Sequence, residues 1–205
     1  MNYYISDLHI GHSNVIKFDD RPFKDIDEMF QTILTNWNNT VTNKDTVYII
    51  GDFIWDKENQ WYDIVKQFKG HKVLIKGNHD PKQFSHKTKS LFLDIKDYAM
   101  ITDGANKLVL SHYPIICYPK DYFPNVYMLY GHVHSTREMD YVQQARKIIR
   151  DKINGTYGEP LGQLLHVGCM EKYMDYTPRT LDEIIKGDAE AYPFERKENN
   201  VEIEY

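Results

Sequence analysis

Five short clusters of Asp, Asn and His residues each follow directly after a predicted strand. They read Asp7-Leu8-His9, Gly51-Asp52, Gly77-Asn78-His79-Asp80, Ser111-His112-Tyr113-Pro114 and Gly131-His132-Val133-His134. A single cluster of this kind is common by chance, and a lone His is more often structural than a ligand. Five in succession, each at a strand end, indicate loops that leave the same edge of a sheet and converge on one crevice, where open α/β sheets build their sites.

These clusters predict a site that holds two metal ions. The candidate ligands supply only oxygen and imidazole nitrogen, and they are Asp7, His9, Asp52, Asn78, His112, His132 and His134. Such a set, without thiolate, suits Mn, Fe, Ni or Zn. Seven side chains are too many for one ion, whereas one carboxylate can bridge two ions about 3.5–4 Å apart, as in hydrolytic two-metal sites. An extended segment would place His132 and His134 on the same side, so that each reaches a different ion.

The order and spelling of the clusters resemble the calcineurin-like metallophosphoesterase superfamily, whose pattern is D-x-H, G-D, G-N-H-D/E, an isolated His and G-H-x-H. The resemblance extends from Tyr3 to about Lys186. A small bacterial and phage subgroup of predicted phosphoesterases resembles this chain at three further places, which are Ile10-Gly11-His12-Ser13-Asn14, Arg21-Pro22-Phe23, and Val167-Gly168 with Thr180-Leu181-Asp182-Glu183-Ile184. The superfamily implies a four-layer αββα sandwich of mixed sheets flanked by helices, and metal-dependent hydrolysis of phosphoesters.

The resemblance also implies a role for each ligand. It assigns Asp7, His9, Asp52 and His134 to the first metal, and Asp52, Asn78, His112 and His132 to the second, so that Asp52 bridges. A water held between the ions would have a pKa lowered toward neutrality and would attack phosphorus in line. His79 is the candidate to stabilise the transition state or protonate the leaving oxygen; the alternative is a residue that supports the ligands. Asp80 is expected to orient His79 or a ligand.

Candidate substrate contacts rest on position alone. His12 follows His9 closely enough to touch a substrate phosphate, and Tyr113 follows His112 and could line the pocket. The guanidinium of Arg21 could clamp a phosphate with two hydrogen bonds, or equally form a salt bridge within its loop. No motif surrounds the remaining histidines, and a structural role is expected for His71, His86 and His166.

The elements that must position these residues follow from the hydrophobic pattern. Strands are predicted at residues 3–6, 46–50, 72–75, 107–111, 126–130 and 164–167, and residues 95–111 suggest a hairpin. Helical spacing is found at 26–37, 61–68 and 181–185, the last helix entered through Thr180 and closed by Gly187. The alternation predicts an α/β sandwich with a mixed sheet.

One more predicted helix, at residues 139–153, directly follows the last candidate ligands. Val142, Ala145, Ile148 and Ile149 form its apolar face, and the basic residues outside that face are Arg146, Lys147, Arg150 and Lys152. A basic side of this kind is usually a solvated surface. The helix could also cap the cleft, bind an anionic leaving group or form a dimer contact.

The composition is that of a soluble globular protein. The chain has 205 residues, 41% hydrophobic and 27% charged, and we expect one domain over 1–194 and an acidic tail over 195–205 that is loose or adds an edge strand. The net charge of −5 disfavours nucleic acid held by a broad electrostatic surface, but bound cations would still attract a phosphate. Two distant cysteines, no signal-peptide pattern and no membrane-spanning stretch predict a cytoplasmic protein with no membrane partner.

Three functions fit the sequence. The first is hydrolysis of a small phosphomonoester or phosphodiester, such as a nucleotide, with two divalent ions, Mn before Fe, Ni or Zn. The second is a nuclease or RNA-end phosphatase with the same metal core. The third is a non-catalytic scaffold of the same fold, which the complete ligand set and His79 disfavour. The preference between monoesters and diesters, the natural substrate, the physiological metal and the oligomeric state stay open.

Overall fold

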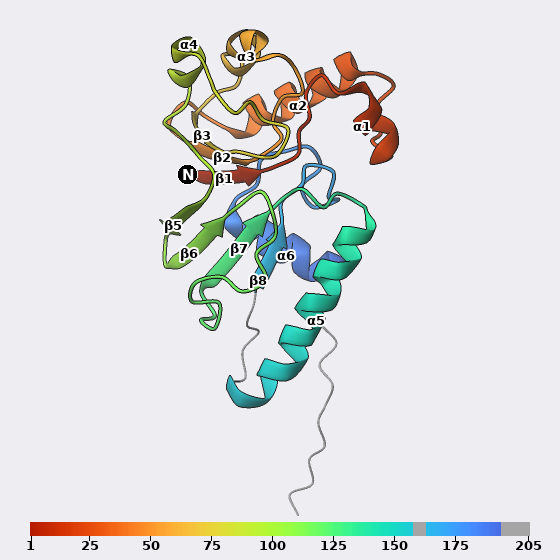
Figure 1. Ribbon diagram of the computed structural model, residues 1–205, viewed down its shortest axis with the longest axis vertical. Helices are drawn as coiled ribbons and strands as arrows, with labels where there is room; N and C mark the ends of the chain where they lie inside the picture. Colours follow the sequence, from red (N-terminus) through yellow and green to blue (C-terminus); the bar gives the residue numbers. More distant parts are fainter. Residues whose placement is uncertain (158–162, 194–205) are drawn as a thin grey trace, which may run out of the picture.

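Two four-stranded sheets form the centre of the molecule, seen in a computed structural model that describes residues 1–157 and 163–193 (Figure 1). The first sheet contains β1 (Asn2–Ile5), β2 (Thr46–Ile50), β3 (His71–Ile75) and β4 (Asp94–Lys96), all parallel and in this order. The second contains β5 (Ala99–Asp103), β6 (Asn106–Leu110), β7 (Val126–Tyr130) and β8 (Gln163–His166), of which only β5 and β6 pair antiparallel.

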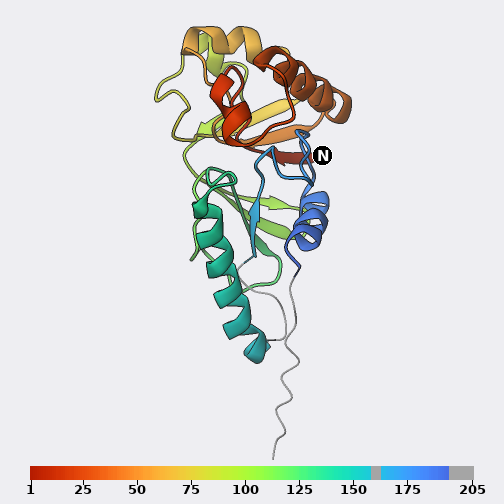
Figure 2. The same cartoon turned by 90° about the vertical axis from the view of Figure 1, so that its right-hand side faces the viewer.

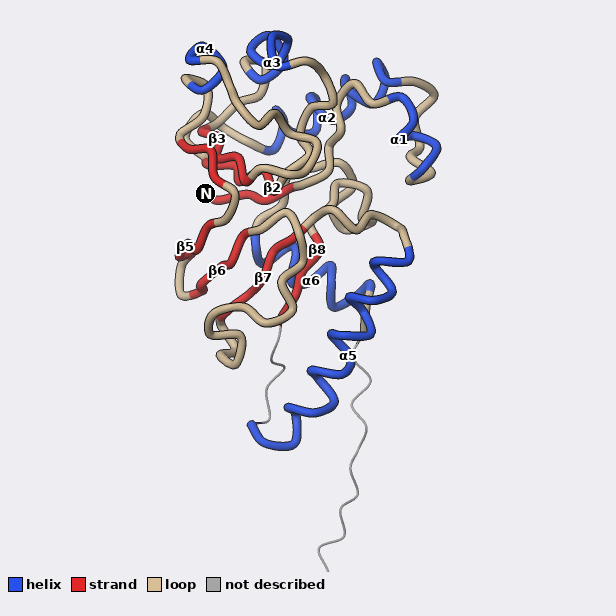
Figure 3. Tube along the Cα trace, in the orientation of Figure 1, coloured by secondary structure: helices blue, strands red, loops and turns tan. Residues whose placement is uncertain are grey.

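Helices lie on the outer sides of the two sheets, as Figures 2 and 3 show. The helices α2 (Ile26–Thr40), α3 (Glu58–Val65) and α4 (His86–Lys89) cover the first sheet, and α1 (Ser13–Phe18) lies beside them. The second sheet carries α5 (Arg137–Tyr157), while α6 (Leu181–Ala191) contacts β8 and β1. The predicted mixed α/β sandwich of two sheets flanked by helices is therefore confirmed.

Alternating side chains of the second sheet explain why it is buried on both faces. Leu108 and Leu110 of β6 belong to the large core shared with the first sheet. Val109, between them, belongs to a second cluster with Met139 and Val142 of α5. Successive side chains of a strand point to opposite faces, so one strand serves both the core between the sheets and the core under α5.

Capping residues explain where two helices begin. The Asp25 carboxylate accepts the Glu28 backbone N–H at 2.8 Å and starts α2. Thr180 and Glu183 form a reciprocal capping box at the start of α6. The prediction that Gly187 closes this helix is wrong, because α6 continues to Ala191. A Cβ at Gly187 would lie 2.6 Å from Cγ of Tyr173, so this glycine allows close packing inside the helix.

The structure differs from the predicted elements at further places. The hairpin is confirmed as β5 and β6, but Ile95 belongs to β4 and pairs in parallel with β3. The helices α1 and α4 were not predicted, because six and four residues are too few for a periodic signal. The predicted acidic tail at 195–205 and its edge strand lie outside the described residues.

Across the described residues, every helix is too short or too polar to cross a lipid bilayer.

The helix predicted at 139–153 is α5, which begins two residues earlier and ends four residues later. Arg146 was expected on its solvated side, and this is wrong. The side chain is buried, and its guanidinium forms an ion pair with the buried Asp188 of α6. A pairing partner from a distant helix makes such burial tolerable, and sequence periodicity cannot show it. The side chains of Arg150 and Lys152 lie outside the described part of the chain.

Candidate metal centre

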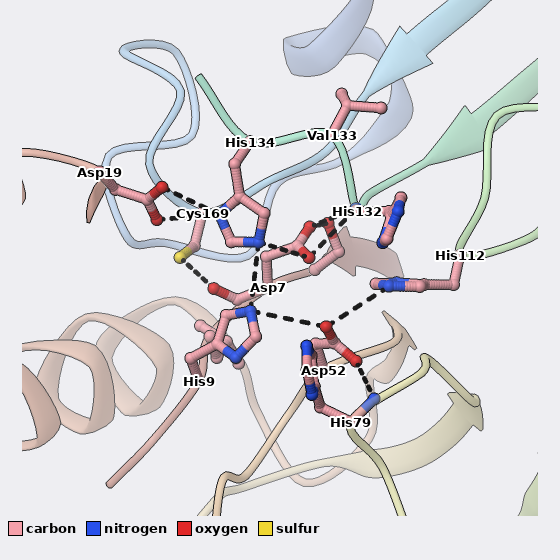
Figure 4. Close-up of polar contacts among 12 residues, drawn as sticks. Asp7, His9, Asp19, Asp52, His79, His112, His132, Val133, His134 and Cys169 are labelled. Atoms are coloured by element: carbon pink, nitrogen blue, oxygen red, sulfur yellow. Dashed lines mark hydrogen bonds and ion pairs between the residues drawn. The ribbon is translucent and has the colours of Figure 1, made fainter. Parts of the chain in front are cut away.

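The five loops that carry the Asp, Asn and His clusters come from two sheets. Asp7, Asp52 and Asn78 follow β1, β2 and β3, whereas His112 and His132 follow β6 and β7 of the second sheet. The expectation of one shared sheet edge was therefore wrong, since the carboxyl edges of two sheets meet. A bridge between Ser6 and Gly168 joins those edges. The meeting of two edges brings loops from both halves of the chain together (Figure 4).

One group of side chains surrounds the end of β1. Nε2 of His9 lies 3.2 Å from Nε2 of His134 and 3.5 Å from Oδ2 of Asp52. Nε2 of His134 also lies 3.5 Å from Oδ1 of Asp7. Four potential ligand atoms, from Asp7, His9, Asp52 and His134, thus face one another.

A second group shares Asp52 with the first. Oδ1 of Asn78 lies 3.0 Å from Nε2 of His112 and 3.0 Å from Nδ1 of His132. Nε2 of His112 lies 3.5 Å from Oδ2 of Asp52. The same oxygen of Asp52 is therefore equally distant from one imidazole of each group.

The donor atoms of both groups fit divalent cations. Two ligand atoms, each about 2.1 Å from one ion, lie about 3.0–3.4 Å apart. The facing donor atoms of the two groups are 3.0–3.5 Å apart, which is close to that range. Nδ1 of His134 donates to Asp19 and Nδ1 of His112 donates to the Ile50 carbonyl at 3.0 Å. In the neutral rings, both Nε2 atoms therefore present lone pairs toward the site.

The backbone of this site is unusual. Five candidate ligands adopt the left-handed conformation, with φ of 56° for Asp7, 47° for His9, 52° for Asp52, 72° for His132 and 46° for His134. Each such residue costs about 1–3 kcal/mol unless its surroundings hold it, and strain of this kind concentrates at functional sites. The extended segment expected around His132 and His134 is wrong, because both residues have a positive φ. They still reach different groups.

Two glycines allow the loops to approach one another. A Cβ at Gly77 would lie 2.7 Å from the Asp52 nitrogen, and a Cβ at Gly131 would lie 2.9 Å from Cβ of Ser6. Both distances are far inside normal contact, so any side chain here would separate the loops that carry Asp52 and Asp7.

Asp80 holds the loops after β2 and β3 together. Its carboxylate accepts the backbone N–H groups of Asp52 at 3.0 Å, Phe53 at 3.0 Å and Gly77 at 2.8 Å. Burial raises the pKa of Asp80 to about 6, although these N–H groups oppose the shift. Asp80 was expected to orient either His79 or a ligand. Its carboxylate binds the backbone of the loop that carries the candidate ligand Asp52, which is the second of these roles.

Arg21 and Asp19 form a buried pair behind the site. The Arg21 guanidinium donates to Asp19, to the Leu8 carbonyl at 3.0 Å and to the Asp7 carbonyl at 2.8 Å. Its N–H groups are thus directed into the protein, so the salt bridge is observed and the phosphate clamp is not. Asp19 also accepts from Nδ1 of His134 at 2.9 Å. Sequence reasoning missed Asp19, and its position two residues before Arg21 was the only signal for it.

The other predicted contact residues lie around the rim. His79 is exposed, and its backbone N–H donates to Oδ1 of Asp52 at 2.9 Å. The His12 ring caps α1 by accepting the Val15 N–H at 2.8 Å. Both rings pack on Trp55, with centroids 4.5 Å and 3.9 Å away, and sequence reasoning did not single out this tryptophan. The ring of Tyr113 packs against that of His132, with centroids 4.3 Å apart.

Burial and nearby opposite charges shift the pKa values of the ionisable groups in the cation-free protein. Burial lowers the pKa of His9 to about 4. Burial also opposes charge on His112, but its hydrogen bond to Asp52 and the nearby carboxylates raise its pKa to about 9. Asp52 is desolvated too, yet His112 holds its pKa down at about 2. In the cation-free protein, a charged His112 therefore compensates the buried carboxylates, and a bound cation would replace that charge.

Comparisons with known proteins show the family of this chain. The family model described as calcineurin-like phosphoesterase matches residues 3–192. An uncharacterized protein of Methanocaldococcus jannaschii is 32% identical over 174 residues, which cover 83% of this chain and 91% of that protein. The Gene 66 protein of Mycobacterium phage L5 is 33% identical over 81 residues, covering 38% of this chain and 39% of its own.

A solved structure supports the same fold. The protein of unknown function AQ665 from Aquifex aeolicus is 28% identical and superposes with a TM-score of 0.62, covering 91% of this chain and 98% of that chain. The family model spans nearly the whole chain, and its members are metal-dependent hydrolases. The chain therefore belongs to the calcineurin-like phosphoesterase family and is a phosphoester hydrolase.

Proposed function

We propose that this chain hydrolyses a small phosphomonoester or phosphodiester, such as a nucleotide, at a centre of two divalent metal ions. The observation that carries the proposal is the position of one carboxylate oxygen. Oδ2 of Asp52 lies 3.5 Å from Nε2 of His9 and 3.5 Å from Nε2 of His112. A carboxylate shared by two imidazole groups is the arrangement that a bridging ligand requires.

The two groups of side chains divide the seven candidate ligands between the ions. Asp7, His9 and His134 would hold one ion, Asn78, His112 and His132 the other, and Asp52 would contact both. The donors are oxygen and nitrogen, which favours Mn and also allows Fe, Ni or Zn. When bound, the two ions supply positive charge to phosphate oxygens and lower the pKa of a water molecule.

The side chains around the ligands position them and move a proton. Asp19 fixes the ring of His134 through Nδ1, so that its Nε2 faces His9. His79 is exposed at the rim with its ring 5.7 Å from that of His9, centre to centre. From there its imidazole can donate a proton to the leaving oxygen of a phosphoester. His12 would contact the substrate phosphate from the same flank.

Metal analysis of Asp52→Asn tests the bridging role. The wild type should bind two Mn²⁺ per chain and hydrolyse p-nitrophenyl phosphate or bis(p-nitrophenyl) phosphate. Asp52→Asn should lose metal and activity. Asp63→Asn, on the exposed side of α3, is the matched control and should change neither. A variant Asp52→Asn with both metals and full activity would refute the bridge. Bound metal without turnover of these esters, short RNA or short DNA would favour a scaffold.

A further inference from the structure

A cavity of about 440 Å³ opens directly beside the candidate metal centre. His132, a proposed ligand, forms part of its wall, and the loop after β6 and the first turns of α5 form the rest. Its volume is typical of sites that bind small molecules. The cavity therefore offers space for a part of the substrate that is attached to a phosphate at the metal centre.

The walls of this cavity suit an uncharged ring. Tyr113 is 50% exposed, and its ring centre lies 4.3 Å from that of His132. Tyr141, on α5, is 59% exposed and lines the same cavity, together with Val142 and other apolar groups. Exposed aromatic faces of this kind bind planar rings by stacking.

The charge at the cavity disfavours a phosphate inside it. Glu138 is the charged residue of the lining, and its carboxylate lies 3.6 Å from Nε2 of His132. A carboxylate at this place repels an anion, and it repels the dianion of a monoester more than the monoanion of a diester. The phosphate is therefore expected at the metal centre, and an uncharged organic group in the cavity.

The proposed acid lies on a different side of the centre. Figure 4 shows His79 and His132 on opposite sides of the Asp52 carboxylate. His79 packs on Trp55, which is 43% exposed. If His79 protonates the leaving oxygen, the leaving group lies beside Trp55 and away from the cavity. A substrate that fills both sides must carry two organic groups on one phosphate.

We propose that the substrate is a phosphodiester whose non-leaving group carries a planar, uncharged ring bound in the cavity lined by Tyr113 and Tyr141. The inference rests on the proposed function. In the reaction, the oxygen of water forms a bond to phosphorus and the P–O bond to the leaving group breaks. The leaving oxygen takes a proton, and the product is a monoester that keeps the ring in the cavity.

Two synthetic diesters isolate the contribution of the ring. Thymidine 5′-(p-nitrophenyl phosphate) and methyl p-nitrophenyl phosphate have the same leaving group and the same charge, and they differ in the group that would enter the cavity. With Mn²⁺ bound, kcat/KM should be about tenfold or more higher for the thymidine ester, as stacking on aromatic side chains predicts. Equal values for the two esters would overturn the proposal.

A matched pair of variants then tests the cavity itself. Tyr141→Ala should raise KM for the thymidine ester about tenfold and leave the methyl ester unchanged. Tyr122→Ala removes a tyrosine with the same exposure, 59%, from outside the cavity, and it should change neither ester. An unchanged thymidine preference in Tyr141→Ala would show that the ring binds elsewhere.

Binding without metal separates this inference from the proposed function. Thymidine should give saturation-transfer NMR signals with the metal-free wild type and weaker signals with Tyr141→Ala. Hydrolysis of both esters without thymidine binding or preference would overturn the cavity proposal and leave the proposed function intact. Thymidine binding without hydrolysis of any ester by the metal-bound protein would overturn the proposed function, and with it the diester substrate.

Discussion

The substitution Gly77→Ala should disable the metal centre without removing a ligand. Gly77 lies where the loop after β3 crosses the loop that carries Asp52, and its N–H donates to Asp80 at 2.8 Å. Its φ lies outside the left-handed region, so alanine is compatible with the backbone and the change tests space alone. The added Cβ would overlap the Asp52 carboxylate and lie 2.7 Å from its backbone nitrogen.

The geometry sets the size of the expected effect. An ordinary contact needs at least 3.4 Å, so the two loops must separate by about 0.7 Å. Overpacking of this kind costs about 1–3 kcal/mol of the free energy of unfolding. A displacement approaching 1 Å at a reacting centre costs about 100-fold in rate. Because Asp52 is the proposed bridge, we expect kcat/KM to fall by about 100-fold and Mn²⁺ affinity to fall with it.

The assay compares Gly77→Ala with Gly104→Ala. Gly104 lies in the β5–β6 turn with φ of 60°, and a Cβ added there would meet no other atom within 4 Å. Alanine at this position therefore costs about 1–2 kcal/mol in backbone strain and does not touch the site. Urea unfolding, Mn²⁺ titration calorimetry and hydrolysis of bis(p-nitrophenyl) phosphate should show both variants destabilised, with activity lost only in Gly77→Ala. Wild-type metal affinity and activity in Gly77→Ala would refute the reasoning.

Three other predictions concern a support of the metal centre, a proposed ligand and the buried ion pair between α5 and α6. Asp19→Asn should weaken Mn²⁺ binding about 10- to 100-fold, because His134 loses the carboxylate that orients it, and unchanged binding by calorimetry would contradict this role. Mn²⁺ affinity should rise as pH increases toward 9, because His112, with its pKa raised to about 9, must lose a proton to bind an ion. Equal affinities at pH 7 and pH 9 would exclude that competition. Asp188→Ala should destabilise the fold by about 3–5 kcal/mol in urea, since Arg146 stays buried without its partner, and adding Arg146→Met should restore most of the loss.

Much of the fold could be predicted because the signals are local. The strands at residues 46–50 and 126–130 match β2 and β7 residue for residue, since short apolar runs bounded by polar residues specify them. The prediction failed where a partner from elsewhere decides the outcome. Arg146 is buried because Asp188 meets it, and Ile95 joins the first sheet because β3 offers a free edge.

The candidate ligands could be named because metal chemistry restricts residue types and because each follows a strand. Among the residues that support the ligands, the sequence pointed to Asp80, which lies inside a ligand cluster, but not to Asp19 or Trp55. Asp19 has no motif, and its contact with His134 spans 115 positions in the chain. Trp55 is one of three tryptophans, and only the folded chain brings it onto His79 and His12.

By itself, the sequence determined the kinds of donor atoms, their order, and the strand ends that carry them. The tertiary structure decided that two sheets rather than one contribute the loops, that five candidate ligands adopt the left-handed conformation, and that a cavity opens beside His132. The reason is physical. Residue types and periodicity are local properties, whereas the 3.5 Å distance from Asp52, after β2, to His112, after β6, depends on how the two sheets pack over one shared core.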